Sequence, residues 1–379
     1  MAIDNKDKKI LNVPHLRFPE FSGEWNKYTI NDLATVVGGG TPDTTVKSYW
    51  GGDIQWFTPS EIGKNKYVDF SKRTITRDGL DNSSAKLLPL HTILLSSRAT
   101  VGECSIASNE CTTNQGFQSL IAKQCNIDFL YYLIQTKKKD LIRNACGSTF
   151  LEISANEIRK IKVAVPVQNE QEQIAKLLSL IDERIATQNK IIEKLQSLIK
   201  GLRVCCMQRV YGNNVYLSEI AQIYQPQTIS STELTEDGFL VYGANGIIGK
   251  YKDYNHETEQ ICITCRGNTC GMVNYTKPMS WITGNAMVIN TDKYQDKVCK
   301  RYLYHYLSAY NFNSIISGSG QPQIVRTPLE KLKITLPTIS EQKQKAIIFD
   351  KIQDKIDINH KVLNLYIGQK QYLLRQMFI

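Results

Sequence analysis

The sequence predicts an α+β fold built by internal duplication. We expect two β-rich domains of mixed structure in a pseudo-twofold arrangement, separated by two long helices that form an antiparallel coiled coil. The first observation is that the stretch 168–208 lies on the stretch 339–379 when it is shifted by 171 positions without a gap. The second is that the short apolar runs before each stretch recur in the same order.

The long helices set the predicted limits of the segments. A proline closes a strand-like run before each helix, at Pro166 and Pro337, and a helical apolar pattern then continues for about 35 residues without a proline. The expected segments are an N-terminal arm at 1–27, a first domain at 28–167, a central helix at 168–208, a second domain at 209–338 and a C-terminal helix at 339–379.

Composition narrows the class of protein. The 379 residues are enough for more than one core, and no apolar run approaches the roughly 18 residues of a membrane span. The charged N-terminus lacks the apolar stretch of a signal peptide, so we expect a cytoplasmic protein whose ten cysteines stay reduced. A formal net charge of +10 favours a polyanionic partner, nucleic acid rather than membrane.

The N-terminal arm and the elements of the first domain are predicted from the proline and glycine residues that mark turns. Residues 13–25 are rich in proline and aromatic residues, which indicates an extended arm packed on a neighbouring element. Sharp turns are expected at 38–44 (GGGTPDT) and at Gly51-Gly52-Asp53. Short β-rich runs follow, then a helix at about 128–144, a Gly147-Ser148 turn and a closing strand ending near Val165.

The second domain repeats this plan. The runs NVYLSEIAQI, ICITCRG, RYLYHYLSAY and LEKLKITLP correspond to KYTINDLATV, ILLSSRA, DFLYYLIQTK and EIRKIKVAVP of the first half, and Gly318-Ser319 corresponds to Gly147-Ser148. The tyrosines of these helical runs are expected to cover the domain core. The stretch 56–90 has no evident counterpart, so we expect a shared frame with divergent inserts, as in two domains that bind different targets.

Apolar residues in the long helices alternate steps of four and three, as in the seam of a coiled coil. The predicted seam residues are Ile174, Leu178, Ile181, Ile185, Gln188, Ile192, Leu195, Ile199 and Leu202 in the first helix and Phe349, Ile352, Ile356, Asn359, Leu363 and Tyr366 in the second. A helix of about 38 residues is roughly 57 Å long, so the pair is predicted to act as a ruler between the domains.

One polar residue interrupts each seam near its middle. If the helices pair antiparallel, Gln188 and Asn359 meet, and a buried amide pair fixes the register. The alternative is that each helix lies on its own domain, with these residues at the edge of the contact.

Catalytic and metal sites are not expected in this chain. The run ANGIIGKY at 244–251 departs from a phosphate loop at both Ala244 and Tyr251, so its glycines are assigned to tight turns. Zinc ligation by Cys262, Cys265 and Cys270 with His256 is disfavoured, because the spacing is uneven and a strand directs the first two to opposite faces. No nucleophile triad and no motif for S-adenosylmethionine is evident.

Basic residues gather in regions that look like loops in both domains. Arg98 and Arg266 follow equivalent apolar strands, and arginine binds phosphate or a guanine edge with two hydrogen bonds. The candidate DNA-binding residues are Lys64, Lys66, Lys72, Arg73, Arg77, Arg98, Lys250, Lys252 and Arg266. The alternative for each is a solvated surface charge.

These features together resemble a known family. The segments LRFPEFSGEW, GGGTPDT and YWGGDIQWFTPSEI, the GS turn before each closing strand and the P-x(3)-EQ start of each long helix are similar to the specificity subunit of type I restriction-modification systems. The resemblance covers nearly the whole chain, although the GGTP-type turn is missing from the second domain.

The resemblance implies a non-catalytic subunit that binds double-stranded DNA. Its two target-recognition domains would read the halves of a bipartite, asymmetric target, the first with residues 28–167 and the second with residues 209–338, and the paired helices would fix an unspecific spacer. It implies two methyltransferase subunits and two restriction (motor and nuclease) subunits as partners. Those partners would use S-adenosylmethionine, ATP and magnesium, and this chain would bind no cofactor.

Two other interpretations stay open. One is a specificity module that works with a methyltransferase alone, without a nuclease. The other is a coiled-coil interaction scaffold without sequence-specific DNA binding.

Overall fold

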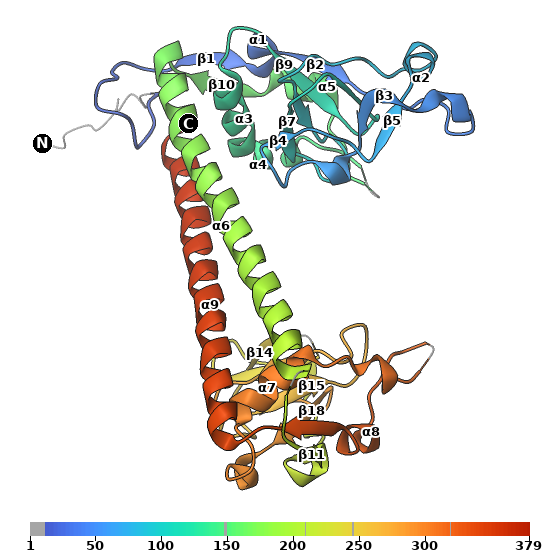
Figure 1. Ribbon diagram of the computed structural model, residues 1–379. Helices are drawn as coiled ribbons and strands as arrows, with labels where there is room; N and C mark the ends of the chain where they lie inside the picture. The colour runs from blue at the N-terminus through green and yellow to red at the C-terminus, as the bar shows by residue number, and fades with distance from the viewer. Residues whose placement is uncertain (1–11, 148–149, 209, 245, 319) are drawn as a thin grey trace, which may run out of the picture. The chain divides into compact units, whose positions relative to one another are not determined.

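Two long helices, α6 (Gln168–Gln208) and α9 (Ile339–Gln376), are the longest elements of the computed structural model (Figure 1). The structure describes residues 12–147, 150–208, 210–244, 246–318 and 320–379. The chain divides into two compact units, unit 1 (Met1–Gln188 with Leu363–Ile379) and unit 2 (Asn189–Val362). Each unit therefore combines one β-rich domain with part of both long helices.

Unit 1 contains two sheets and a separate strand pair. The five-stranded sheet has the order β2-β9-β6-β7-β4, the three-stranded sheet has the order β5-β3-β8, and β1 pairs with β10. The strands are β1 (Asn26–Thr29), β2 (Ala34–Gly38), β3 (Trp50–Phe57), β4 (Tyr67–Val68), β5 (Arg73–Ile75), β6 (Ile93–Leu95), β7 (Cys104–Ala107), β8 (Cys111–Thr113), β9 (Gln118–Ala122) and β10 (Lys162–Val165). The shorter helices are α1 (Ile30–Leu33), α2 (Arg77–Asp81), α3 (Ile127–Thr136), α4 (Lys138–Arg143) and α5 (Ala155–Lys160).

Unit 2 contains the corresponding elements. A four-stranded sheet has the order β12-β18-β15-β16, a three-stranded sheet has the order β14-β13-β17, and β11 pairs with β19. The strands are β11 (Asn213–Tyr216), β12 (Gln222–Tyr224), β13 (Phe239–Gly243), β14 (Gly246–Tyr251), β15 (Ile261–Thr264), β16 (Val273–Tyr275), β17 (Trp281–Ile282), β18 (Ala286–Asn290) and β19 (Lys333–Leu336). The shorter helices are α7 (Lys300–Ala309) and α8 (Arg326–Glu330).

The duplication extends further than the sequence indicates. In unit 1, β3 pairs antiparallel with β5 and parallel with β8, and in unit 2, β13 pairs antiparallel with β14 and parallel with β17. The expectation that the stretch 56–90 has no counterpart is therefore wrong for β5 and for the end of β3. Backbone hydrogen bonds define these strands, so the pairing persists where side-chain identity is lost. The short strand β4, which extends the larger sheet of unit 1, belongs to the divergent part.

The helix predicted at 128–144 is two helices, because the chain leaves helical geometry at Lys137 between α3 and α4. Phe129 to Ile134 are all buried, which places α3 against the core of unit 1. In α7, Tyr302 is fully buried and Tyr304 is half-buried against the core of unit 2. The prediction that the helical tyrosines cover the domain cores is thus confirmed.

The long helices run antiparallel within each unit. In unit 1, Lys370 forms an ion pair with Asp182 at 2.8 Å, and the guanidinium of Arg184 lies 5.9 Å from the ring centre of Tyr366. Residue numbers along α9 therefore decrease where those along α6 increase. In unit 2, Lys345 near the start of α9 donates to the carbonyl oxygen of Cys206 near the end of α6.

The predicted seam residues are buried or half-buried, and none is exposed. Ile174, Leu178 and Ile181 belong to the core of unit 1, and Ile199 packs with Phe349 in the core of unit 2. Gln188 is buried and the Asn359 amide donates to the carbonyl oxygen of Lys355 at 2.6 Å. Because these two residues belong to different units, their contact stays a prediction.

The EQ pair that opens each long helix has a structural explanation. Gln171 is buried, donates to the carbonyl oxygen of Pro166 and accepts from the backbone N–H of Asn126. Gln342 likewise donates to the carbonyl oxygen of Pro337 and accepts from the backbone N–H of Cys299. Each glutamine therefore joins the end of the closing strand and the long helix to the start of a domain helix, α3 in unit 1 and α7 in unit 2.

The N-terminal arm packs on unit 1 as predicted over its described residues. Glu170 is fully buried, and its carboxylate accepts two hydrogen bonds from Arg17, at 2.7 and 2.8 Å, and one from the indole N–H of Trp25. The backbone N–H of Leu16 donates to the carbonyl oxygen of Gln376 at the end of α9. Residues 1–11 of the predicted arm lie outside the described residues.

Candidate nucleic-acid interface

Arg98 lies in a tight loop that follows strand β6. The loop closes on itself, because the backbone N–H of Gly102 donates to the carbonyl oxygen of Ser96 at 3.0 Å. Ala99 has a φ of 62°, in the left-handed region that residues other than glycine seldom adopt. The Arg98 side chain is 48% exposed, so the loop presents its guanidinium to solvent.

A short segment pairs with this loop, and we call it the strap (residues 146–147 and 150–153). Two backbone hydrogen bonds, of 3.0 and 2.9 Å, join loop to strap on either side of the facing residues Arg98 and Glu152. Glu152 also exchanges both backbone hydrogen bonds with Cys146 on the other side. Ser148 of the predicted turn lies outside the described residues.

Unit 2 builds the same loop and strap. The loop follows β15 and the second strap comprises residues 317–318 and 320–324. Two hydrogen bonds of 3.0 Å flank the facing residues Arg266 and Gln323, and Gln323 exchanges both backbone bonds with Ser317. Gly267, with a φ of 87°, takes the place of Ala99. The predicted equivalence of Arg98 and Arg266 is therefore confirmed at the level of the backbone, whereas Ser319 lies outside the described residues.

The glycine in each strap is required by the fold. Gly147 and Gly318 have φ values of 128° and 93°, and an added Cβ would lie 2.1 and 2.4 Å from the carbonyl oxygens of Phe150 and Gln321. Glycine alone fits such a close approach of two backbones. The Gly of the repeated GS motif is thus explained by the turn of the strap.

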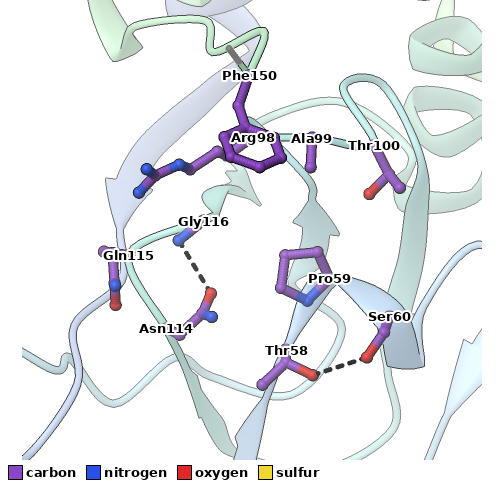
Figure 2. A pocket seen from close by; sticks show the side chains of 10 residues that line it. All are labelled: Thr58, Pro59, Ser60, Arg98, Ala99, Thr100, Asn114, Gln115, Gly116 and Phe150. Carbon is purple, nitrogen blue, oxygen red and sulfur yellow. Dashed lines mark hydrogen bonds between the residues drawn. The ribbon is translucent and has the colours of Figure 1, made fainter.

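The loop of unit 1 borders an open cleft of about 440 Å³ (Figure 2). Its lining residues come from the loop, the strap, the segment after β3 and the segment after β8. They are Thr58, Pro59, Ser60, Arg98, Ala99, Thr100, Asn114, Gln115, Gly116 and Phe150. The Phe150 ring is 60% exposed at the mouth. Although most of the cleft surface is apolar, its lining residues carry a guanidinium, two amides and three hydroxyls, a combination that suits contact with the methyl groups and the polar edges of bases.

Neighbouring groups orient the amides of this cleft. The side-chain oxygen of Asn114 accepts from the backbone N–H of Gly116 at 2.9 Å, as the dashed line in Figure 2 shows. The side-chain oxygen of Gln115 accepts from the hydroxyl of Thr41, in the GGGTP turn, at 2.5 Å. That turn therefore supports the cleft. The sequence analysis missed Asn114, Gln115 and Phe150. The segment after β8 and the strap meet the arginine loop only in the folded domain, and no local pattern in the sequence links them.

Arg73 belongs to an aromatic group on the surface of unit 1. Its guanidinium carbon lies 3.5 Å from the ring centre of Trp50, and Trp50 packs edge-on against Trp56. Lys72 and Phe70 beside it are exposed, the latter at 80%. Arg73 lies in strand β5 rather than in a loop, and its cation–π contact holds the guanidinium in one place at the surface.

The remaining basic candidates of unit 1 differ in their surroundings. Lys64 is exposed in a turn, and Arg77 in helix α2 forms a loose ion pair with Asp81 at 3.5 Å. Lys66 is mostly buried instead, with its ammonium 2.7 Å from Asp128 and 2.6 Å from the hydroxyl of Ser179. Those internal contacts occupy Lys66, so we leave it out of the interface proposed below.

In unit 2, Lys250 lies in strand β14 and faces Asp237 at 3.6 Å, and Lys252 is exposed next to Tyr251. They lie on the hairpin β13–β14, whereas Arg266 lies in the loop after β15. The glycine-rich run 244–251 is largely this strand, not a loop that opens a helix, which is incompatible with a phosphate loop.

Equivalent polar networks fasten each domain to both long helices. In unit 1, the Tyr132 hydroxyl of α3 donates to Asp182 of α6 at 2.7 Å, and Lys370 of α9 pairs with the same carboxylate. In unit 2, His305 of α7 contacts Asp350 of α9 at 2.8 Å and Arg203 of α6 at 2.9 Å.

Burial and the neighbouring guanidinium of Arg203 favour the neutral form of His305. Since arginine only donates, Nδ1 of His305 must accept from Arg203, and Nε2 carries the proton that is donated to Asp350. Burial lowers the pKa of His305, and the hydrogen bond to Asp350 opposes this effect. Burial also lowers the pKa of His256, which lies between Tyr224 and Asn255.

These two histidines predict acid sensitivity. Their folded-state pKa lies below the unfolded value of about 6.5, so the unfolded chain binds more protons as the pH falls through that value, and stability is lost. Between pH 7.5 and 5.5 we expect each histidine to cost up to about 1.4 kcal/mol. Thermal unfolding of the wild type and of the His305→Gln and His256→Gln variants checks this. A wild-type pH dependence that neither substitution reduces would contradict the assignment.

The cysteines near β15 behave as buried thiols. Cys262 and Cys265 pack in different core clusters, as expected for opposite faces of a strand, and burial raises the pKa of Cys262 to about 12. In the part of the chain that the structure describes, three or more potential metal ligands nowhere gather into a group. No helix among the described residues is both long and apolar enough to cross a membrane.

Comparison with known sequences points to one family. Residues 22–197 and 213–365 match the model described as the type I restriction modification DNA specificity domain. The chain is 26% identical over 355 residues to the EcoprrI specificity subunit of a type I restriction enzyme from Escherichia coli, a match that covers 86% of this chain and 87% of that one. It is 39% identical over 183 residues to the MjaIX specificity subunit from Methanocaldococcus jannaschii, but spans only 42% of that relative's length and 45% of its own.

Solved structures share the fold. The S subunit of a type I restriction-modification system from M. genitalium superposes with a TM-score of 0.63 at 18% identity, over 97% of this chain and 99% of that chain. A chain from a study of complex assembly and conformational transition of the type I system gives a TM-score of 0.57 at 13% identity, over 92% and 96% of the two chains.

Proposed function

Because the chain belongs to the type I restriction-modification DNA specificity family, we propose that its two domains read the two halves of a bipartite, asymmetric target in double-stranded DNA. The observation that best supports this proposal is the arginine loop built twice on the same backbone, with unlike side chains around each copy. A common frame with different surroundings suits two different half-sites. The chain itself performs no catalytic step in this proposal.

We assign the spacing of the half-sites to α6 and α9. The seam residues are buried or half-buried within each unit. Polar networks centred on Asp182 and Asp350 join each domain to both helices. A domain fastened in this way keeps one orientation on its helices. The length of the helices then sets the length of the unspecific spacer.

The outer faces of the long helices are the proposed docking surface for two methyltransferase subunits, with which two restriction subunits associate. Exposed apolar side chains recur there in steps of 11 or 7 residues along each helix, and apolar side chains that line up on an exposed helix face mark interaction sites. They are Leu180, Leu365 and Tyr372 in unit 1 and Ile191, Leu198, Ile347 and Ile358 in unit 2. Adenine methylation with S-adenosylmethionine, and DNA cleavage with ATP and magnesium, belong to those partners.

A methylation map tests the proposed function. The chain is co-expressed with the methyltransferase of its system, and the host DNA is sequenced for modified adenine. We expect a split motif with two unlike halves that disappears when the chain is omitted. An assembled complex that modifies no motif would instead favour the scaffold interpretation. Whether a nuclease subunit also takes part is decided by purifying the complete assembly.

The scaffold interpretation makes a different prediction for the chain alone. A DNA-binding protein with many Lys and Arg contacts loses affinity steeply as salt rises, because binding releases counterions. Filter binding of duplex DNA across a salt series therefore separates the two interpretations. A scaffold would show no binding above that of a protein of similar charge.

Replacing Arg98 or Arg266 by Ala is expected to reduce methylation of the cognate site by roughly 5- to 150-fold, the value of one good bidentate contact. Both side chains are exposed, so the fold stays intact. Arg143→Ala, an exposed arginine on α4, is the matched control. Full activity of both loop variants would remove these arginines from the DNA interface.

A further inference from the structure

Each loop arginine faces one side chain of its strap, and the two facing residues differ: Glu152 in unit 1 and Gln323 in unit 2. We propose that these two positions are specificity-determining, so that the couples Arg98–Glu152 and Arg266–Gln323 each read one base pair of their own half-site. This inference rests on the function proposed above.

The backbone places the two couples identically. The hydrogen bonds between loop and strap flank each couple rather than join its members, so each couple is a non-hydrogen-bonded antiparallel pair. Such pairs bring Cα atoms to about 4.5 Å, and their side chains project side by side from the same face. The next residues, Ile153 and Ile324, are buried and anchor the strap from below. Loop and strap therefore present two adjacent side chains from a fixed base.

The facing residues are not explained by stability. The Arg98 and Glu152 side chains are about half-exposed, and their charged atoms are 3.7 Å apart, which is too loose to contribute much. Gln323, equally exposed, carries no charge for Arg266 to pair with. A stabilising role would not require different chemistry at two positions with the same backbone.

The chemistry of the couples suits bases rather than phosphates. A carboxylate that faces a polyanion is repelled, unless a donor such as the cytosine N4 amino group satisfies it. Glutamine instead forms two hydrogen bonds with adenine N6 and N7, and arginine binds guanine or a neighbouring phosphate. We therefore assign Glu152 to contact a cytosine and Gln323 to contact an adenine. The arginine of each couple contacts a guanine or a phosphate next to that base.

The surroundings of the first couple agree with a base-reading site. Arg98 lines the cleft of Figure 2, together with the amides of Asn114 and Gln115. Phe150, two residues before Glu152 on the strap, is exposed at the same cleft. In unit 2 the corresponding residue is Gln321, so the two straps differ in a second outward position.

Exchanging the facing residues tests the proposal. The complexes with Glu152→Gln and Gln323→Glu are purified with the methyltransferase, and methylation is measured on duplexes in which each base pair of both half-sites is varied in turn. We expect each variant to change its preference at one base pair of one half-site by roughly 5- to 150-fold. The other half-site and the spacer stay as in the wild type. Glu152→Ala should relax the same base pair without a new preference.

One control variant, Glu157→Gln, is matched to Glu152→Gln. Glu157→Gln changes another half-exposed glutamate of unit 1, which pairs with Lys160 on α5, and should alter no base preference. Unchanged preferences in both exchange variants, or an equal loss at every position, would overturn the proposal. Either result leaves the wild-type motif in place, whereas failure of the proposed function would remove that motif from the wild type itself.

Discussion

A variant with four residues added to each long helix is expected to methylate a target with a longer spacer, while both half-sites stay unchanged. Each helical residue adds about 1.5 Å, so four residues add about 6 Å, close to two base-pair steps of about 3.4 Å. We would insert them at Gln188 and Asn359, the middle of each seam, because four residues keep the apolar stripe approximately in phase. Sequencing of modified adenine in co-expressing cells measures the spacer.

The control for this experiment lengthens the chain without lengthening the helices. Four small polar residues inserted after the exposed Asn109, between β7 and β8, should leave the spacer as it was. If the helix insertions also leave the spacer unchanged while methylation persists, the helices are not the ruler.

Asp350→Ala is expected to destabilise unit 2 by about 3 kcal/mol, the low end of the range for breaking a buried ion pair, since the carboxylate is 28% exposed. Asp350 accepts from His305 and Arg301, so its removal leaves the His305 Nε2–H without an acceptor and Arg301 and Arg203 without a counter-charge. Although burial acts to raise it, the pKa of Asp350 is lowered because these groups donate hydrogen bonds to it.

Urea unfolding measures this loss, and hydrogen exchange locates it. Exchange should accelerate most in α7, whereas the equivalent Asp182→Ala variant should accelerate exchange in α3. The exposed Asp354 on the same helix provides the control, because surface substitutions usually change stability by less than about 0.5 kcal/mol. A loss of under about 1 kcal/mol for Asp350→Ala would show that the network does not hold α7.

Local patterns predicted much of this fold from the sequence. The long helices followed from apolar spacing such as Ile174, Leu178 and Ile181, and the closing strands followed from the alternation that ends at Val165. The equivalence of Arg98 and Arg266 followed from the apolar strands before them. Each of these patterns spans about ten residues or fewer, so the spacing and type of its side chains are enough to predict the local structure.

The features that were missed depend on contacts between distant segments. The match of β3 and β5 to β13 and β14 resides in backbone pairing, which no pattern of side chains in the sequence reveals. Lys66 looked like a surface charge, but Asp128 of α3 and Ser179 of α6 contact its ammonium. The cleft residue Phe150 is next to Arg98 only because the strap folds back.

Unit 1 has a core built from both ends of the sequence. Its core contains Leu373, Met377 and Phe378, and the Phe378 ring stacks on Phe129 at 5.2 Å. The first domain therefore needs residues from the far end of the sequence to close its core, whereas unit 2 is continuous from Asn189 to Val362. A truncation that removes residues 363–379 would open the core of the first domain and leave the core of the second complete.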